Sequence, residues 1–158
     1  MTNKTQKNIR LCCIVALVLC VLWAVFKVFV FIGYLTGWGG VSEKVDWSVN
    51  VAMKFSFFVL YLLSSVALIT LCFVIVFNTL RGLREQVAFP QNNVKPLFCL
   101  ALTNFVYLLC WINQPLLFQD GFVLGCSGSN FIIPFLLLFF AFMYKVAADA
   151  VEENNLTV

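Results

Sequence analysis

A single lysine inside an apolar run is the first candidate for chemistry in this chain. Lys27 lies near the end of the run from Leu11 to Ile32. An ionisable side chain inside a membrane-spanning segment is costly, so it often marks a functional site. A lysine this close to the end of a span can instead extend its ammonium group to the membrane interface. We favour the interfacial position and keep a transport path as the alternative.

A second polar set lies in the third apolar run, at helical spacing. Thr103, Asn104 and Tyr107 are three to four residues apart, so a helix places them on one face. An asparagine in lipid is costly unless it is hydrogen-bonded, and this face should therefore turn toward other helices. Packing between helices is the first interpretation of this face, and a polar lining for a conduit is the sharper alternative.

The longest polar interruption, from Asn78 to Leu97, separates two pairs of apolar runs. Its candidate contacts to a partner or to lipid headgroups are Arg81, Arg84, Phe89, Asn93 and Lys95. Each basic residue near an anionic membrane surface contributes about 1 kcal/mol of attraction. Asn92 or Asn93 is also suited to cap the following helix, because an asparagine side chain accepts hydrogen bonds from free N–H groups at a helix start.

Two adjacent carboxylates, Glu152 and Glu153, lie in the polar tail of residues 149–158. Neighbours in sequence on an exposed segment form no pocket, so we do not interpret them as an acid and base pair. On the same side of a membrane as the connector, they could pair with Arg81 or Arg84. That pairing predicts a docking surface for a cytoplasmic protein, whereas a solvated tail and a connector held by headgroups need no partner.

The residue types and motifs that most enzymes need are absent from the sequence. There is no histidine, which is the commonest general base and metal ligand. The seven cysteines show no C-x-x-C spacing, and there is no Gly-rich phosphate-binding motif. The net charge of +3 is spread over short segments, which disfavours nucleic-acid binding. We therefore predict no catalytic residue, no cofactor, no metal site and no enzymatic activity.

Composition predicts the elements that must position these residues. The chain is 63% hydrophobic and 11% charged, with a mean hydropathy of +0.99. This is too little polar surface for a water-soluble globule, so we predict one integral membrane domain over residues 1–158. Because about 20 apolar residues span a bilayer, we expect an all-α fold with four transmembrane helices in two hairpins. The predicted spans are residues 11–32, 55–80, 97–112 and 131–148, with a connector at 81–96 and a tail at 149–158.

Prolines and apolar loop residues set further expectations. The second helix should end at Phe89-Pro90, because the residue before a proline disfavours the helical conformation. Pro96 and Pro134 fall in predicted first turns, where proline is tolerated. The apolar loop segment 116–118 is expected to lie in the membrane interface.

The distribution of basic residues predicts the orientation. One side of the predicted membrane has Lys4, Lys7, Arg10, Arg81, Arg84, Lys95 and Lys145, and the other side has Lys44 and Lys54. Short cytoplasmic loops are enriched in lysine and arginine. We therefore expect a multi-pass protein of the plasma membrane with both termini in the cytoplasm.

Two short stretches also resemble a known family. The connector is similar to the pattern P-F-x-x-x-N-V-[KR]-x-L, with matches at Phe89, Asn93, Val94, Lys95 and Leu97. The tail from Glu152 to Val158, EENNLTV, is similar to the ending E-E-N-D-L-T-[VI]. Together they resemble domain-of-unknown-function family 2975, bacterial membrane proteins with four spans. Three positions depart from the family pattern: Ala88 replaces the usual proline, Pro96 a common basic residue and Asn155 an acid.

This resemblance implies a location in the bacterial plasma membrane with both ends inside. Family members are often encoded beside a small helix-turn-helix regulator, which implies signalling or control of that regulator. Our first hypothesis is a sensor or regulator that acts on such a cytoplasmic partner. The alternative is a small transporter or channel subunit that uses Lys27, Thr103, Asn104 and Tyr107. The expected partners are the lipid bilayer and the regulator protein, and a homo-oligomer is left open.

Overall fold

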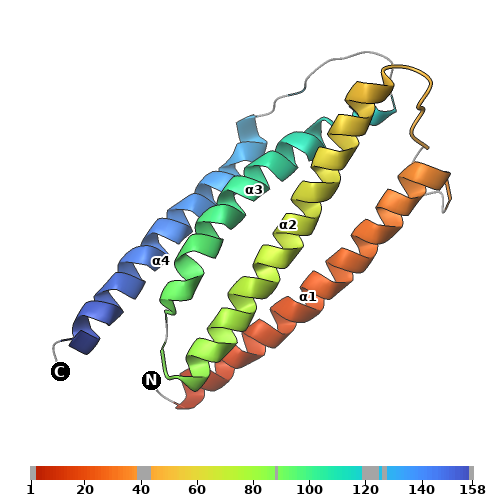
Figure 1. Cartoon of the computed structure of the whole chain (residues 1–158). Coiled ribbons are helices and arrows are strands. Elements are labelled where there is room, and N and C mark those ends of the chain that lie inside the picture. Colours follow the sequence, from red (N-terminus) through yellow and green to blue (C-terminus); the bar gives the residue numbers. More distant parts are fainter. Residues whose placement is uncertain (1–2, 39–43, 88, 119–124, 126–127, 157–158) are drawn as a thin grey trace.

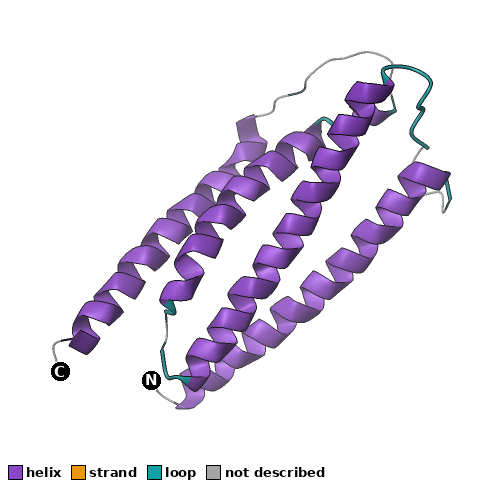
Figure 2. Cartoon of the chain, viewed as in Figure 1, coloured by secondary structure: helices purple, strands orange, loops and turns teal. Residues whose placement is uncertain are grey.

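The computed structural model consists of long helices joined by shorter connections (Figure 1). It describes residues 3–38, 44–87, 89–118, 125 and 128–156. The helices are α1 (Asn3–Thr36), α2 (Val51–Arg84), α3 (Val94–Ile112) and α4 (Ile132–Leu156). Three short 3-10 turns lie in the connections: η1 (Gln91–Asn93), η2 (Gln114–Leu117) and η3 (Gly128–Phe131). The described residues contain no strand (Figure 2), which confirms the all-α prediction for that part of the chain.

Each of the four long helices is long and apolar enough to cross a membrane. The first two helices are longer than predicted, with 34 residues each. At 1.5 Å per residue this length is about 51 Å, whereas the hydrocarbon core of a bilayer is about 30 Å thick. Because α2 continues to Arg84, the connector is shorter than the predicted 81–96 and comprises residues 85–93.

The helices lie side by side in the order of the chain (Figure 1). α1 packs on α2, α2 on α3, and α3 on α4. Among the described residues, no other pair of these helices has Cα atoms within 8 Å. The two predicted hairpins are therefore joined into one row through α2 and α3. Both termini and the connector lie at the same end of this row, and the other two connections lie at the opposite end.

The end of α2 differs from the prediction that Phe89-Pro90 terminates it. The N–H of Val87 donates to the carbonyl of Gly82 at 2.8 Å, and the N–H of Gln86 donates to the carbonyl of Leu83 at 3.4 Å. These two bonds form a Schellman motif, which requires a left-handed residue after the helix. Gln86 takes that conformation with a φ of 61°. The helix therefore ends several residues before the proline.

Gly82 allows the connector to fold back onto α2. A Cβ atom at this position would overlap the Cγ of the buried Pro90 and would lie 3.1 Å from the carbonyl oxygen of Val87. Only a residue without a side chain permits this approach without a shift of the neighbouring atoms. The glycine thus positions the proline against the helix that it was expected to terminate.

The start of α3 is also different from the prediction. Asn93 precedes the helix, but its side chain makes no capping hydrogen bond to it. Its amide instead donates to the hydroxyl of Thr79 on α2 at 2.9 Å. Pro96 and Pro134 do lie in the first turns of α3 and α4, as predicted.

A cluster of buried apolar residues lies toward the end of the row that is away from the termini. Its buried members are Val30, Phe31, Tyr34, Val45, Phe58, Tyr61, Cys110 and Leu117. Leu117 belongs to this core and Phe118 packs against it, and the membrane-interface position predicted for residues 116–118 stays a prediction. Leu117 is fully buried, and the ring of Phe118 contacts that of Tyr34 at a centroid distance of 5.3 Å.

The connection before α2 is held by one buried lysine. Lys54 is 2% exposed, and its ammonium donates to the backbone carbonyl of Asp46 at 2.9 Å. The carboxylate of Asp46 accepts bonds from the backbone N–H and the hydroxyl of Ser48. Those two bonds, the backbone bond first, lower the pKa of Asp46 from its ordinary value.

Candidate functional site

Lys27 lies between helices, where it contacts α2 and α3, and the interfacial position predicted from the sequence stays a prediction. Its side chain is 7% exposed, and its Nζ donates to the hydroxyl of Tyr61 at 2.8 Å. The same Nζ lies 4.9 Å from the ring centroid of Tyr61, 4.9 Å from that of Tyr107 and 5.7 Å from that of Trp23. We call these three rings, with Lys27, the aromatic cage.

Three helices build the aromatic cage. Trp23 and Lys27 are one helical turn apart on α1, Tyr61 comes from α2 and Tyr107 comes from α3. The rings of Tyr61 and Tyr107 stack with a centroid distance of 5.6 Å and an interplanar angle of 27°. In the cage, side chains of α1 therefore contact a side chain of α3, although the backbones of these two helices are not neighbours.

Aromatic faces can replace a carboxylate as the partner of the lysine. In the described part of the chain, no acidic side chain forms a salt bridge with Lys27. A cation over an aromatic face gains about 0.5 to 2 kcal/mol, more when it is desolvated. An ammonium has three N–H donors, and the Tyr61 hydroxyl accepts from one of them. The cage thus holds a positive charge that keeps hydrogen-bonding capacity for an anionic or polar group.

The predicted polar face of the third span is brought to the cage only in part. Tyr107 contacts Lys27, whereas within the described residues neither Thr103 nor Asn104 forms a hydrogen bond with it. The Oδ1 atom of Asn104 is buried and has no hydrogen-bond partner among the residues that the structure describes. Trp23 and Tyr61 were missed in the sequence. The spacing of Trp23 and Lys27 was a usable signal, but nothing in the sequence places Tyr61 opposite them.

A second cluster lies near the termini, where the connector meets α4. The amide of Gln91 donates to the carboxylates of Asp149 at 2.9 Å and Glu152 at 3.0 Å. The ring of Phe89 contacts that of Tyr144 edge to face at 5.4 Å. The connector and the last helix therefore form one continuous surface.

A buried asparagine fixes that surface to α2. Asn93 is fully buried, and its amide donates to Thr79 at 2.9 Å and to the hydroxyl of Tyr144 at 3.3 Å. The Tyr144 hydroxyl donates in turn to the carbonyl of Pro90 at 3.2 Å. These bonds join α2, η1 and α4 in one network, and the Oδ1 atom of Asn93 has no partner in the described part of the chain.

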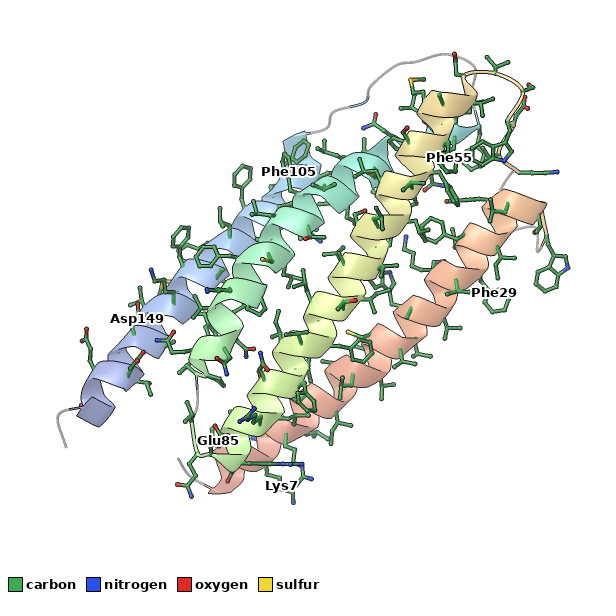
Figure 3. The ribbon with its side chains drawn as sticks, viewed as in Figure 1. Lys7, Phe29, Phe55, Glu85, Phe105 and Asp149 are labelled. Atoms are coloured by element: carbon green, nitrogen blue, oxygen red, sulfur yellow. The ribbon has the colours of Figure 1, made fainter. Side chains whose placement is uncertain are left out.

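A cleft of about 300 Å³ opens beside these contacts, and we call it the tail cleft. It is lined by Glu85, Val87, Phe89, Pro90, Gln91, Asn92, Ala148, Val151 and Glu152. Its lining is more apolar than polar and includes the acidic residues Glu85 and Glu152. Figure 3 shows Glu85 and Asp149 toward the end of the molecule that holds both termini.

The basic residues predicted to bind the tail have other positions. The Nε of Arg81 pairs with Glu85 on its own helix at 3.1 Å. Arg84 lines a separate cleft between α1 and α2 together with Lys7 and Arg10. The tail therefore contacts the connector through Gln91, which we did not single out, and not through Arg81 or Arg84. Lys95 and Glu153 are exposed.

The described residues contain no group of three or more histidine, cysteine, aspartate or glutamate side chains that could hold a metal ion. No family model matches the chain, and no curated protein or solved structure matches it either. The resemblance to domain-of-unknown-function family 2975 therefore stays a prediction.

Proposed function

We propose that the chain is a multi-pass membrane protein that acts as a sensor or regulator by binding a cytoplasmic protein in the tail cleft. The observation that supports this most is the contact of Gln91 with Asp149 and Glu152. It makes one surface out of two segments that are far apart in the chain. A surface shared by a connector and a terminal helix can transmit a change in helix packing to a bound protein.

The chemistry of the tail cleft favours a basic amphipathic helix as the partner segment. The apolar side chains that line the cleft can pack against the apolar face of such a helix, as in other helix-in-groove complexes. The carboxylates of Glu85 and Glu152 can pair with its lysine or arginine residues, because opposite charges across an interface guide association. The resemblance given above adds a small helix-turn-helix regulator as the proposed partner, and a bacterial plasma membrane as the proposed location.

Site-specific photo-crosslinking tests this proposal in native membranes. A photo-reactive amino acid at Val151, which lines the tail cleft, should capture a discrete cytoplasmic protein. The same group at Val146, which is 65% exposed on α4 outside the cleft, is the matched control and should not capture it. Reversing the charges with Asp149→Lys and Glu152→Lys should lower the yield at Val151 by on the order of tenfold.

Two outcomes of this experiment would remove the docking proposal. One is capture of the same proteins from Val151 and Val146. The other is an unchanged yield in the charge-reversed variant, with Lys145→Glu as a charge control on the same helix outside the cleft.

The aromatic cage supports a second candidate function, a small transporter or channel subunit for anions. The observation that supports this function is that Lys27 contacts Tyr107 and uses one of its three N–H donors in the bond to Tyr61, so the other N–H groups could bind an anion. In chloride-loaded proteoliposomes, the protein should then accelerate chloride efflux, and Lys27→Gln should abolish that efflux at an equal amount of inserted protein. Equal efflux from the variant and the unmodified protein would exclude this function.

A further inference from the structure

The cleft between α1 and α2 at the end near the termini has an unbalanced positive charge. It measures about 590 Å³ and is lined by Gln6, Lys7, Arg10, Ile14, Leu80, Leu83 and Arg84. We call it the basic cleft. Three of these side chains are cationic and none is acidic. Arg81, the other basic residue of this turn, is paired with Glu85, whereas the described residues include no salt-bridge partner for Arg84. The charge of Arg84 is thus available to an anion.

An apolar groove continues from the basic cleft along the same two helices. It measures about 300 Å³ and is lined by Leu17, Phe73, Val74, Phe77, Asn78 and Leu80. Leu80 lines both cavities, so the groove and the basic cleft adjoin at this residue. A ligand that fills both cavities must be charged at one end and apolar at the other.

Helical spacing explains why charge and apolar surface are arranged in this order. On α1, Arg10, Ile14 and Leu17 follow one another at intervals of three to four residues. On α2, Phe77, Leu80 and Arg84 do the same in the opposite direction, because the two helices are antiparallel. The cationic ends of both stripes meet near the termini, and the apolar ends meet farther into the predicted span.

The two helices are held together at the charged end by a polar contact. The amide of Gln6 on α1 donates to the carbonyl of Leu83 on α2 at 2.7 Å. This carbonyl belongs to the last turn of α2 and also accepts from the N–H of Gln86. The bond therefore joins α1 to α2 beside the arginines that line the basic cleft.

We propose that the basic cleft and the apolar groove together bind one anionic phospholipid. Its phosphate contacts Arg10, Arg84 and Lys7, because guanidinium groups bind phosphate oxygens in a bidentate geometry. One acyl chain lies in the groove against Leu17 and Phe77. The apolar groove favours a lipid over a free phosphate ion as the ligand, since an inorganic phosphate would leave the groove empty. This site is separate from the tail cleft and does not depend on a protein partner.

The test measures lipid retained by the purified full-length protein. The protein is reconstituted in nanodiscs of phosphatidylcholine with a minor fraction of phosphatidylglycerol, extracted into mild detergent, and its bound lipids are quantified. The unmodified protein should retain phosphatidylglycerol over phosphatidylcholine. Arg10→Gln with Arg84→Gln should reduce this retention by on the order of tenfold, because each cation near a headgroup adds attraction.

Matched variants distinguish lipid binding in the basic cleft from general attraction by basic residues on the surface. Arg81→Gln with Lys95→Gln removes the same charge outside the cleft and should retain the lipid. Phe77→Ala should weaken retention through the groove, whereas Phe139→Ala, an exposed residue of α4, should not. The proposal would be overturned if the Arg81 and Lys95 double variant lost as much phosphatidylglycerol as the Arg10 and Arg84 double variant. Displacement of phosphatidylglycerol by inorganic phosphate, with no effect of Phe77→Ala, would assign a free-phosphate site instead and would also overturn it.

Discussion

At the scale of single residues, Lys27 shows what a helical period predicts and what it does not. The sequence indicates a charged residue in an apolar run, and the spacing places Trp23 one turn away from it on the same helix. The acceptor of its hydrogen bond, Tyr61, comes from another helix. Partners on other helices depend on packing, which the period of one helix does not encode. The same reason explains why Gln91 and Tyr144 were missed.

The Tyr61 hydroxyl should stabilise the fold only while the lysine is present. Tyr61→Phe removes the acceptor and leaves a buried ammonium without its bond, so we expect a loss of about 1 to 3 kcal/mol in the free energy of unfolding. Lys27→Met should be neutral or stabilising, because it replaces a buried charge by an apolar side chain of similar length.

Equilibrium unfolding in mixed detergent micelles measures these changes. The control is Tyr61→Phe in the Lys27→Met background, where the loss should be much smaller. An equal loss in both backgrounds would show that Tyr61 acts through packing alone and not through its bond to the lysine.

At the scale of elements, the apolar runs are a good guide to the number and position of the helices, because each run is long enough to span a bilayer. Their ends are harder to predict. α2 ends at Arg84, since a Schellman motif with Gln86 stops it before the proline. Glycine is the usual residue in that conformation, and glutamine gives no sequence signal for it. Asn93 matched a capping residue by type, but its buried bonds to Thr79 and Tyr144 are tertiary contacts.

Gln86→Gly should stabilise the protein, because glycine adopts a positive φ without the steric cost of a side chain. We expect a gain of about 1 kcal/mol in the free energy of unfolding. Thermal unfolding of the protein in detergent, followed by circular dichroism at the helix band, measures it. Asn92→Gly is the control, since Asn92 is exposed without a positive φ and gains nothing from glycine. A stability gain for Asn92→Gly as large as that for Gln86→Gly would contradict this account.

At the scale of the whole molecule, the termini and the connector share one end, which fits the four predicted spans. Which side of a membrane that end faces depends on charge, and the basic residues concentrate at it. Exposed apolar side chains such as Leu102 and Phe139 lie along the helices, as expected for surfaces in contact with lipid. The order of the helices in the row was beyond prediction, because apolar runs carry no information about which neighbour each one chooses.

Reporter fusions test the orientation. A reporter that is active only in the cytoplasm, fused after Val158, should be active, because the excess of lysine and arginine keeps that end inside. The same reporter inserted after Asn50, in the connection before α2, should be inactive. Activity in the reverse pattern would place the tail cleft outside the cell and remove the proposed cytoplasmic partner.

The arrangement of the helices in chain order also has a consequence for biosynthesis. Each helix that leaves the ribosome finds its packing partner in the helix made just before it, so no segment has to wait for a distant one. Lys27 can donate its hydrogen bond to Tyr61 as soon as α2 arrives, and Tyr107 closes the aromatic cage one helix later. Mostly local contacts of this kind favour rapid assembly. The chain can therefore assemble by stepwise addition during translation, with Lys27 hydrogen-bonded once α2 is in place.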